Sequence, residues 1–438
     1  MPQIKTRIYD FLRGFNPLYV AISLSMLMLA GIILNKSSVS YNGDILSYIK
    51  AWTNFYSEGE IDSFRTPVYP ILLGIGRKLF GAENWALFPV LVQIITFYSC
   101  GILFSRMIFG VISDRRVAWF TVFLYFLFYP IINSLPLLTT EALSFSITSA
   151  WLYCVWRFLQ HVQWRFGIYI IMLTLIGIML RPSMLILAFA IVGLAMAGVF
   201  LKNYRRNTLL LLLTLLPVGI VYEVYVNEIE CKTGIRTISV VSVYNNFYMA
   251  RQYNEIFPDL LVDSPQALKL MLSYQEAGDS LLQGYKNNAR WNEIYAFEKF
   301  GNDGLKQMKD YAHALKTNHP DVWFSYIAKR IIYSFSNEGP IKNICNYLVI
   351  TLYTVFFVIG WIKLKRFSIV NFLILMIGGG SLLSIIFYAQ NEFGRLMLPT
   401  SAVLILMGGQ IINCIRVRPF SVNLRELYSE KGQLLKFV

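Results

Sequence analysis

Six ionisable side chains border long apolar stretches of this 438-residue chain, where they could act on a common substrate. They are three acids, Asp44, Glu141 and Glu392, and three arginines, Arg65, Arg181 and Arg395. A carboxylate beside an acceptor hydroxyl can remove its proton as a new bond forms, which typically accelerates a reaction by about 10²- to 10⁴-fold. A guanidinium group matches phosphate oxygens with two parallel hydrogen bonds. These residue types suit the transfer of a group away from a phosphate.

The elements that carry these residues are expected to be membrane helices. Hydrophobic residues make up 56% of the chain and charged residues 15%, as is typical of an integral membrane protein. We predict an all-α polytopic fold with about 10 transmembrane helices, since ~20 apolar residues cross the ~30 Å hydrocarbon layer. The first span is expected to stay in the mature protein and not to be a removable signal peptide, because no small-residue cleavage site follows it. The predicted spans are residues 17–35, 84–105, 117–134, 142–156, 166–180, 182–201, 208–226, 343–362, 369–388 and 396–414.

Every second connection between these spans is basic, which indicates the cytoplasmic side. We therefore expect a multi-pass protein of a bacterial inner (cytoplasmic) membrane, with both termini in the cytoplasm. The net charge of +14 is then explained by the Lys and Arg residues of the cytoplasmic connections. No nucleic acid is expected as a partner. The basic clusters are Lys5, Arg7 and Arg13; Arg106, Arg115 and Arg116; Arg157 and Arg165; Lys202, Arg205 and Arg206; Lys363, Lys365 and Arg366; and Arg416 and Arg418.

The alternation holds only if residues 67–80 do not cross the membrane. We predict that they form an amphipathic helix on the outer interface, preceded by a second one at 44–57. A short tilted eleventh span is the alternative.

The chain then divides into four parts. Residues 1–227 form an N-terminal transmembrane module with a first outer loop at 36–83. Residues 228–340 form a periplasmic loop with helices expected at 264–283 and 290–317. Residues 341–415 hold the C-terminal transmembrane helices, and 416–438 form a cytoplasmic tail.

The predicted spans lack Asp, Glu, Lys and Arg in their apolar cores. Ion-coupled carriers usually need such groups at mid-depth, so a secondary carrier is disfavoured. The topology instead brings the six ionisable residues to one outer rim.

Four stretches carry a resemblance to a known family. They are YNGDILSYIKAW followed by RTPVYPILLGIGRKLFG, then LLTTEAL, LRPS and NEFGRLMLP, and HALKTNHPDVWFSYIAKR is a looser fifth. In order and sidedness the chain resembles the GT-C superfamily of polytopic glycosyltransferases. The likeness is to the branch with the protein mannosyltransferases and the lipid A aminoarabinose and galacturonosyl transferases.

The resemblance implies a function at the periplasmic face. Such enzymes move a sugar from a polyprenyl-phosphate-linked donor to a hydroxyl of a lipid, glycan or protein acceptor, among membrane lipids. Their acid in the first outer loop is the catalytic base, which corresponds to Asp44, and a second acid after the third span corresponds to Glu141. Inversion at the anomeric carbon would follow from one in-line displacement.

The remaining site residues have assigned roles with structural alternatives. Arg65, Arg181 and Arg395 are expected to bind the donor phosphate, although Arg65 could anchor the loop to lipid phosphates and Arg181 could be an interfacial, snorkelling arginine. Tyr41, Tyr69 and Glu392 are candidate substrate-binding residues.

For three of the candidates a role in local structure is the alternative. Tyr69 and Pro70 could instead set the geometry of the interfacial helix. Asp44 and Glu141 could each serve a helix start, which for Asp44 is compatible with catalysis.

Metal use and thiol pairing stay open. No cofactor is certain, and a divalent cation, Mg²⁺ or Mn²⁺, between Asp44 and Glu141 is an alternative that suits oxygen ligands. This chain has Ile45 where the relatives carry a further acid. Cys231 and Cys345 would both lie outside the membrane, either as a bridge or as two free thiols.

Two other functions remain as alternatives. An O-antigen polymerase or ligase would use a lipid diphosphate donor and rely chiefly on arginines. A flippase or exporter of lipid-linked sugars would involve no bond chemistry.

Overall fold

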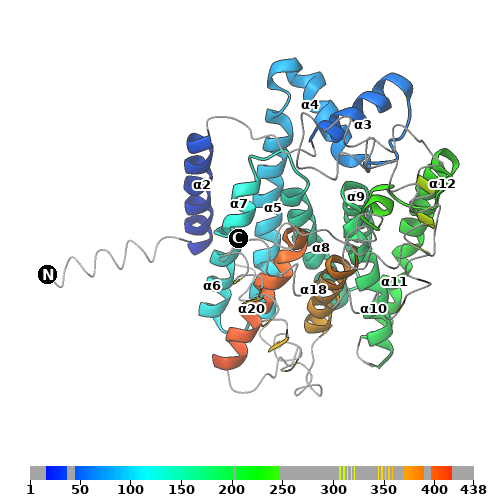
Figure 1. Cartoon of the computed structure of the whole chain (residues 1–438). Helices are drawn as coiled ribbons and strands as arrows, with labels where there is room; N and C mark the ends of the chain where they lie inside the picture. Colours follow the sequence, from blue (N-terminus) through cyan, green and yellow to red (C-terminus); the bar gives the residue numbers. More distant parts are fainter. Residues whose placement is uncertain are drawn as a thin grey trace.

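The chain folds into a bundle of helices (Figure 1). The computed structural model describes residues 16–36, 45–200, 204–246, 369–388 and 396–416, with isolated positions between 305 and 358. The elements of these ranges are α2 (Pro17–Lys36), α3 (Ile45–Glu58), α4 (Val68–Asn84), α5 (Leu87–Val111), α6 (Arg115–Phe126), α7 (Tyr129–Ser134), α8 (Glu141–Gln160), α9 (Trp164–Leu180), η1 (Pro182–Leu185), α10 (Ile186–Phe200), α11 (Arg205–Leu213), α12 (Leu215–Thr233), α18 (Ile369–Tyr388), η4 (Leu398–Thr400) and α20 (Ser401–Arg416).

For the residues that the structure describes, the prediction of an all-helical, multi-pass membrane fold is confirmed. Within the described ranges, 5 helical stretches are long and apolar enough to cross a membrane: Pro17–Asn35, Leu87–Val111, Arg115–Ser134, Pro182–Val199 and Arg205–Thr233. Shorter apolar helices cover Trp164–Leu180, Val370–Leu383 and Leu398–Cys414. The total of about ten spans stays a prediction, as does the span at 343–362, most of which lies outside the described residues.

Two predicted spans are interrupted. The span at 117–134 consists of α6 and α7, which meet just before Pro130, because proline cannot donate a helical hydrogen bond and collides with the preceding turn. The span at 208–226 consists of α11 and α12, which join at Thr214. There the hydroxyl of Thr214 donates to the carbonyl of Leu211 at 2.6 Å, and Pro217 follows.

Helix α8 is the centre of the bundle and packs against both α5 and α9. All of its residues are buried or partly buried. Three of its hydroxyl groups, those of Ser146, Thr148 and Ser149, donate to its own backbone, as Ser146 does to the carbonyl of Ala142 at 2.8 Å. Across helices, the indole of Trp151 donates to the hydroxyl of Thr174 at 2.9 Å. Such pairing is required where no water can reach the polar groups.

Helices α3 and α4 form one end of the bundle (Figure 1). Their existence confirms the two helices predicted for the first outer loop, with α4 continuing four residues beyond the expected end at residue 80. Gly74 makes their close approach possible, because a Cβ at this position would overlap the indole ring of Trp52. Their placement at a membrane interface stays a prediction.

Arginines gather at the opposite end. There the backbone N–H of Asp114, at the start of α6, donates to the side chain of Asn413 in α20 at 3.0 Å, and Asn207 of α11 donates to the carbonyl of Leu159 in α8 at 2.8 Å. The positive-inside rule predicts this arrangement for a cytoplasmic end. The arginines at this end are Arg115, Arg116, Arg157, Arg165, Arg205 and Arg206.

Candidate functional site

A buried ion pair joins two of the predicted site residues. Nη1 of Arg181 lies 3.2 Å from Oε1 of Glu141, with 14% and 3% of the two side chains exposed. Glu141 is the first residue of α8, and Arg181 directly follows the last residue of α9. Pro182 ends α9 at this point, because a residue before proline is pushed out of the helical conformation. The carboxylate thus has a specific partner, which the helix-start alternative did not anticipate.

Helix ends favour the signs of both charges. The start of α8 presents unpaired N–H groups and a partial positive charge to Glu141, and the end of α9 presents a partial negative charge to Arg181. This arrangement offsets part of the cost of removing the two charges from water. In the snorkelling alternative for Arg181, the guanidinium group would instead extend to the lipid phosphates.

Arg65 is held by groups from two parts of the first loop, the turn that contains Asp62 and helix α3. Oδ1 of Asp62 accepts hydrogen bonds from the backbone N–H groups of Phe64 at 2.8 Å and Arg65 at 2.6 Å. From α3, the hydroxyls of Ser47 and Tyr48 accept from the guanidinium at 2.8 and 3.4 Å. The guanidinium carbon also lies 4.5 Å from the ring centre of Tyr48.

Asp62 is an acid that the sequence interpretation did not select. Burial raises its pKa above the ordinary 3.8, although the two N–H groups that it accepts and the charge of Arg65 work against this rise. Its pattern was visible, because Asp followed by Ser-Phe-Arg-Thr-Pro is typical of a turn closed by an Asp side chain.

Two tyrosines lie between Arg65 and Glu141. The rings of Tyr48 and Tyr69 meet edge to face with centres 5.0 Å apart. Tyr69 is fully buried, and burial, the neighbouring Tyr48 and the charge of Glu141 together raise the pKa of its phenol well above 10.0. The phenol is therefore neutral at physiological pH, and its hydroxyl has no hydrogen-bond partner among the described residues. Buried tyrosine hydroxyls usually have one.

The structure thus brings together half of the predicted site. Glu141 and Arg181 are in contact, Tyr69 lies within electrostatic range of Glu141, and Arg65 reaches Tyr69 through Tyr48. The other four candidates lie outside the described residues: Asp44, Tyr41, Glu392 and Arg395. Helix α3 begins directly after Asp44.

The expectations on metal ligands and thiol pairing each involve a residue outside the described ranges, Asp44 and Cys345. No cluster of three or more His, Cys, Asp or Glu side chains occurs within the described ranges, which do not include Asp44. Cys231 is an exposed free thiol, and Cys345 lies outside those ranges.

Comparisons with known proteins concern the fold. No family model matches the sequence, and no curated protein matches it. A solved structure of the archaeal oligosaccharyltransferase AglB from Archaeoglobus fulgidus, in complex with an inhibitory peptide and a dolichol-phosphate, has a TM-score of 0.52 and 14% identity. The match covers 94% of this chain and 53% of the archaeal chain.

A second A. fulgidus oligosaccharyltransferase structure, a complex with Zn and sulfate, has a TM-score of 0.49 and 14% identity over 91% of this chain and 52% of that one. The chain thus spans about half the length of the neighbours it matches. The similarity to AglB is a similarity of fold, and the described residues of this chain are helical with apolar stretches long enough to span a membrane.

Proposed function

We propose that this protein is a membrane glycosyltransferase that moves a sugar from a polyprenyl-phosphate-linked donor to an acceptor hydroxyl at the outer face of the membrane. The observation that carries the proposal is the buried Glu141–Arg181 pair, which lies at the same end of a GT-C-class fold as Arg65. Charge of this kind at a helix-bundle rim is expensive and usually functional.

The proposed reaction is a single displacement. Asp44 removes the proton of the acceptor hydroxyl, whose oxygen forms a bond to the anomeric carbon of the sugar. The bond between that carbon and the phosphate oxygen breaks, and polyprenyl phosphate leaves with the electron pair. Arg65, Arg181 and Arg395 hold the phosphate and stabilise its growing charge.

Glu141 acts on this reaction through Arg181. A guanidinium paired with a buried carboxylate loses rotational freedom, so it is already oriented when the phosphate arrives. Tyr69 contributes a neutral hydrogen-bond donor beside the same pair. Because its hydroxyl lacks a partner among the described residues, a substrate oxygen would satisfy it.

Two observations support the lipid-linked donor and the outer face. The archaeal neighbour was solved with a dolichol-phosphate, a lipid phosphate of the kind that a polyprenyl-phosphate donor would release. The arginines at the end opposite α3 and α4 fit a cytoplasmic surface, which leaves the site on the outer side. In this proposal the acceptor hydroxyl belongs to a lipid, a glycan or a protein.

The test is a transfer assay on purified protein in lipid nanodiscs. Polyprenyl-phosphate sugars are supplied with candidate acceptors, and released polyprenyl phosphate is measured. We expect Asp44→Asn and Arg181→Met to reduce release by at least about 100-fold, while the exposed Arg77→Gln on α4 serves as the control.

Other outcomes decide against the proposal. Turnover of lipid diphosphate donors alone would indicate a polymerase or ligase. Movement of intact lipid-linked sugar across the bilayer without bond cleavage would indicate a flippase. Transfer by Asp44→Asn at the wild-type rate would show that Asp44 is not the base.

A further inference from the structure

Residues 235–244, which we name the clamp, lie against residues 60–66, the turn that carries Arg65. The hydroxyl of Ser239 donates to the carbonyl of Phe64 at 2.7 Å, and the backbone N–H of Val240 donates to the carbonyl of Ser63 at 3.0 Å. The ring of Tyr244 meets that of Phe64 edge to face with centres 5.6 Å apart. The clamp thus contacts the two residues that precede Arg65.

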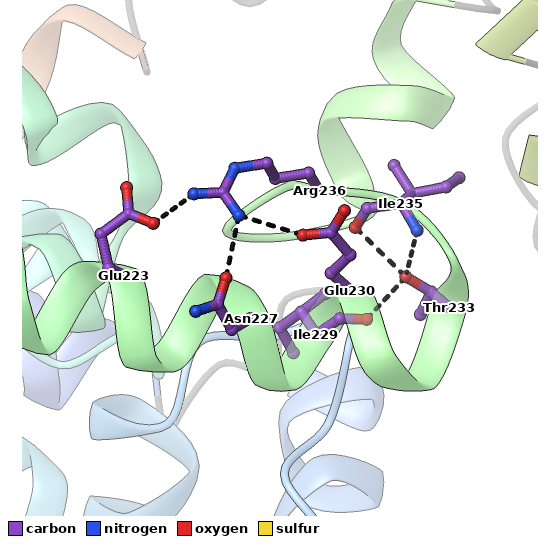
Figure 2. A network of polar contacts seen from close by, with 7 residues as sticks. All are labelled: Glu223, Asn227, Ile229, Glu230, Thr233, Ile235 and Arg236. Atoms are coloured by element: carbon purple, nitrogen blue, oxygen red, sulfur yellow. Dashed lines mark hydrogen bonds and ion pairs between the residues drawn. The ribbon is translucent and has the colours of Figure 1, made fainter.

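The clamp is itself fixed to the end of α12 (Figure 2). Gly234 turns the chain back with a φ of 69°, a conformation that other residues rarely adopt. Arg236 then reaches back along the helix, where its guanidinium donates to Asn227 at 2.8 Å and pairs with Glu230 at 3.0 Å and with Glu223. The reversal therefore has a defined geometry.

A third connection ties α12 directly to the turn. The ammonium group of Lys232 donates to the carbonyl of Ile61 at 3.2 Å and lies 3.6 Å from the carboxylate of Glu60. The start of the turn is thus held by α12, while its end, at Ser63 and Phe64, is held by the clamp.

We infer that the clamp is a positioning device for the Arg65 guanidinium, with Ser239 as its principal positioning residue. This inference rests on the proposed function, in which Arg65 binds the donor phosphate. The clamp fixes the backbone of the turn, while Ser47 and Tyr48 fix the guanidinium. An arginine held at both ends loses less conformational entropy when it binds a phosphate than a mobile one would.

The first experiment measures the turn without any substrate. Hydrogen exchange of the peptide that covers 60–66 is followed in nanodiscs for the wild type, Ser239→Ala and Ser239→Thr, which keeps a hydroxyl. We expect faster exchange in Ser239→Ala and wild-type exchange in Ser239→Thr. Ser57→Ala is the matched control, since its hydroxyl bonds within α3 to the carbonyl of Thr53 at 2.7 Å. Unchanged exchange in Ser239→Ala would overturn the inference.

The second experiment measures binding of a long-chain polyprenyl phosphate in a double-mutant cycle. We expect Ser239→Ala to weaken binding about three- to tenfold, the factor that one lost hydrogen bond gives, and to have no further effect in an Arg65→Ala background. Equal weakening in both backgrounds would overturn the inference, because the clamp would then act on the fold in general.

The two proposals fail in different ways. A wild-type protein that does not bind polyprenyl phosphate would overturn the proposed function, whatever the exchange of the turn shows. A wild type that binds it but gives an additive cycle would overturn the positioning role alone.

Discussion

Replacing Arg181 by methionine is expected to destabilise the protein by about 3–5 kcal/mol, because it leaves a carboxylate with 3% exposure without its positive partner. At 3.2 Å and an effective dielectric constant of ~20, the two charges attract each other by about 5 kcal/mol, most of which desolvation offsets. Once Glu141→Gln has removed the negative charge, the same Arg181→Met change should cost far less. We therefore expect a coupling energy of at least ~2 kcal/mol.

The assay is unfolding of the purified protein in detergent, for the wild type, both single variants and the double variant. The exposed pair Arg236–Glu230, with a separation of 3.0 Å, is the control, and its coupling should be much smaller because water screens it. A coupling below ~0.5 kcal/mol for Glu141 and Arg181 would refute the reasoning, since a buried pair cannot be that weakly coupled.

Three further predictions concern the first outer loop and the turn after α12. Asp62→Asn should keep the turn, because the amide oxygen can accept the same two N–H groups, whereas Asp62→Ala should lower the free energy of unfolding by about 1–3 kcal/mol. Burial raises the pKa of Asp62 in the folded state above its ordinary value of 3.8, so ionisation of this carboxyl group opposes folding. The free energy of unfolding of the wild type should therefore fall relative to that of Asp62→Asn as the pH rises from 4 through the raised pKa. Gly74→Ala should cost about 1–3 kcal/mol in the same unfolding assay, because the new methyl group overlaps Trp52, whereas Gly219→Ala, with open space around it, should not destabilise the protein. Gly234→Ala should lower stability by about 1 kcal/mol and speed hydrogen exchange in 235–244, and Gly234→Asn should do so less, because asparagine tolerates a positive φ.

The sequence predicted the helices well because their apolar lengths are set by the bilayer. The expected span at 369–388 coincides with α18, and that at 17–35 differs from α2 by one residue. The breaks in two spans were missed, although Pro130 and Pro217 mark both of them. A long apolar run conceals such a break, because hydropathy does not report hydrogen bonds.

The contact between Glu141 and Arg181 could have been predicted from the sequence, but its burial could not. Helices α8 and α9 are of similar length and are joined by a short connection, so the start of one, at Glu141, must meet the end of the other, at Arg181. The contact of Ser239 with Phe64, in contrast, joins residues 175 positions apart. Such a contact depends on tertiary packing, and no local pattern reports it.

The burial of α8 bears on how the chain enters the membrane. This helix shows no exposed residue and is absent from the 5 stretches that are apolar enough to span a bilayer alone. Its serines, threonines and terminal charges gain nothing from contact with lipid tails. Insertion of α8 should therefore depend on its neighbours. Helix α5 is synthesised before α8, and α9 is synthesised after it. A truncation after residue 160 should leave α8 poorly inserted, whereas one after 181 should rescue it.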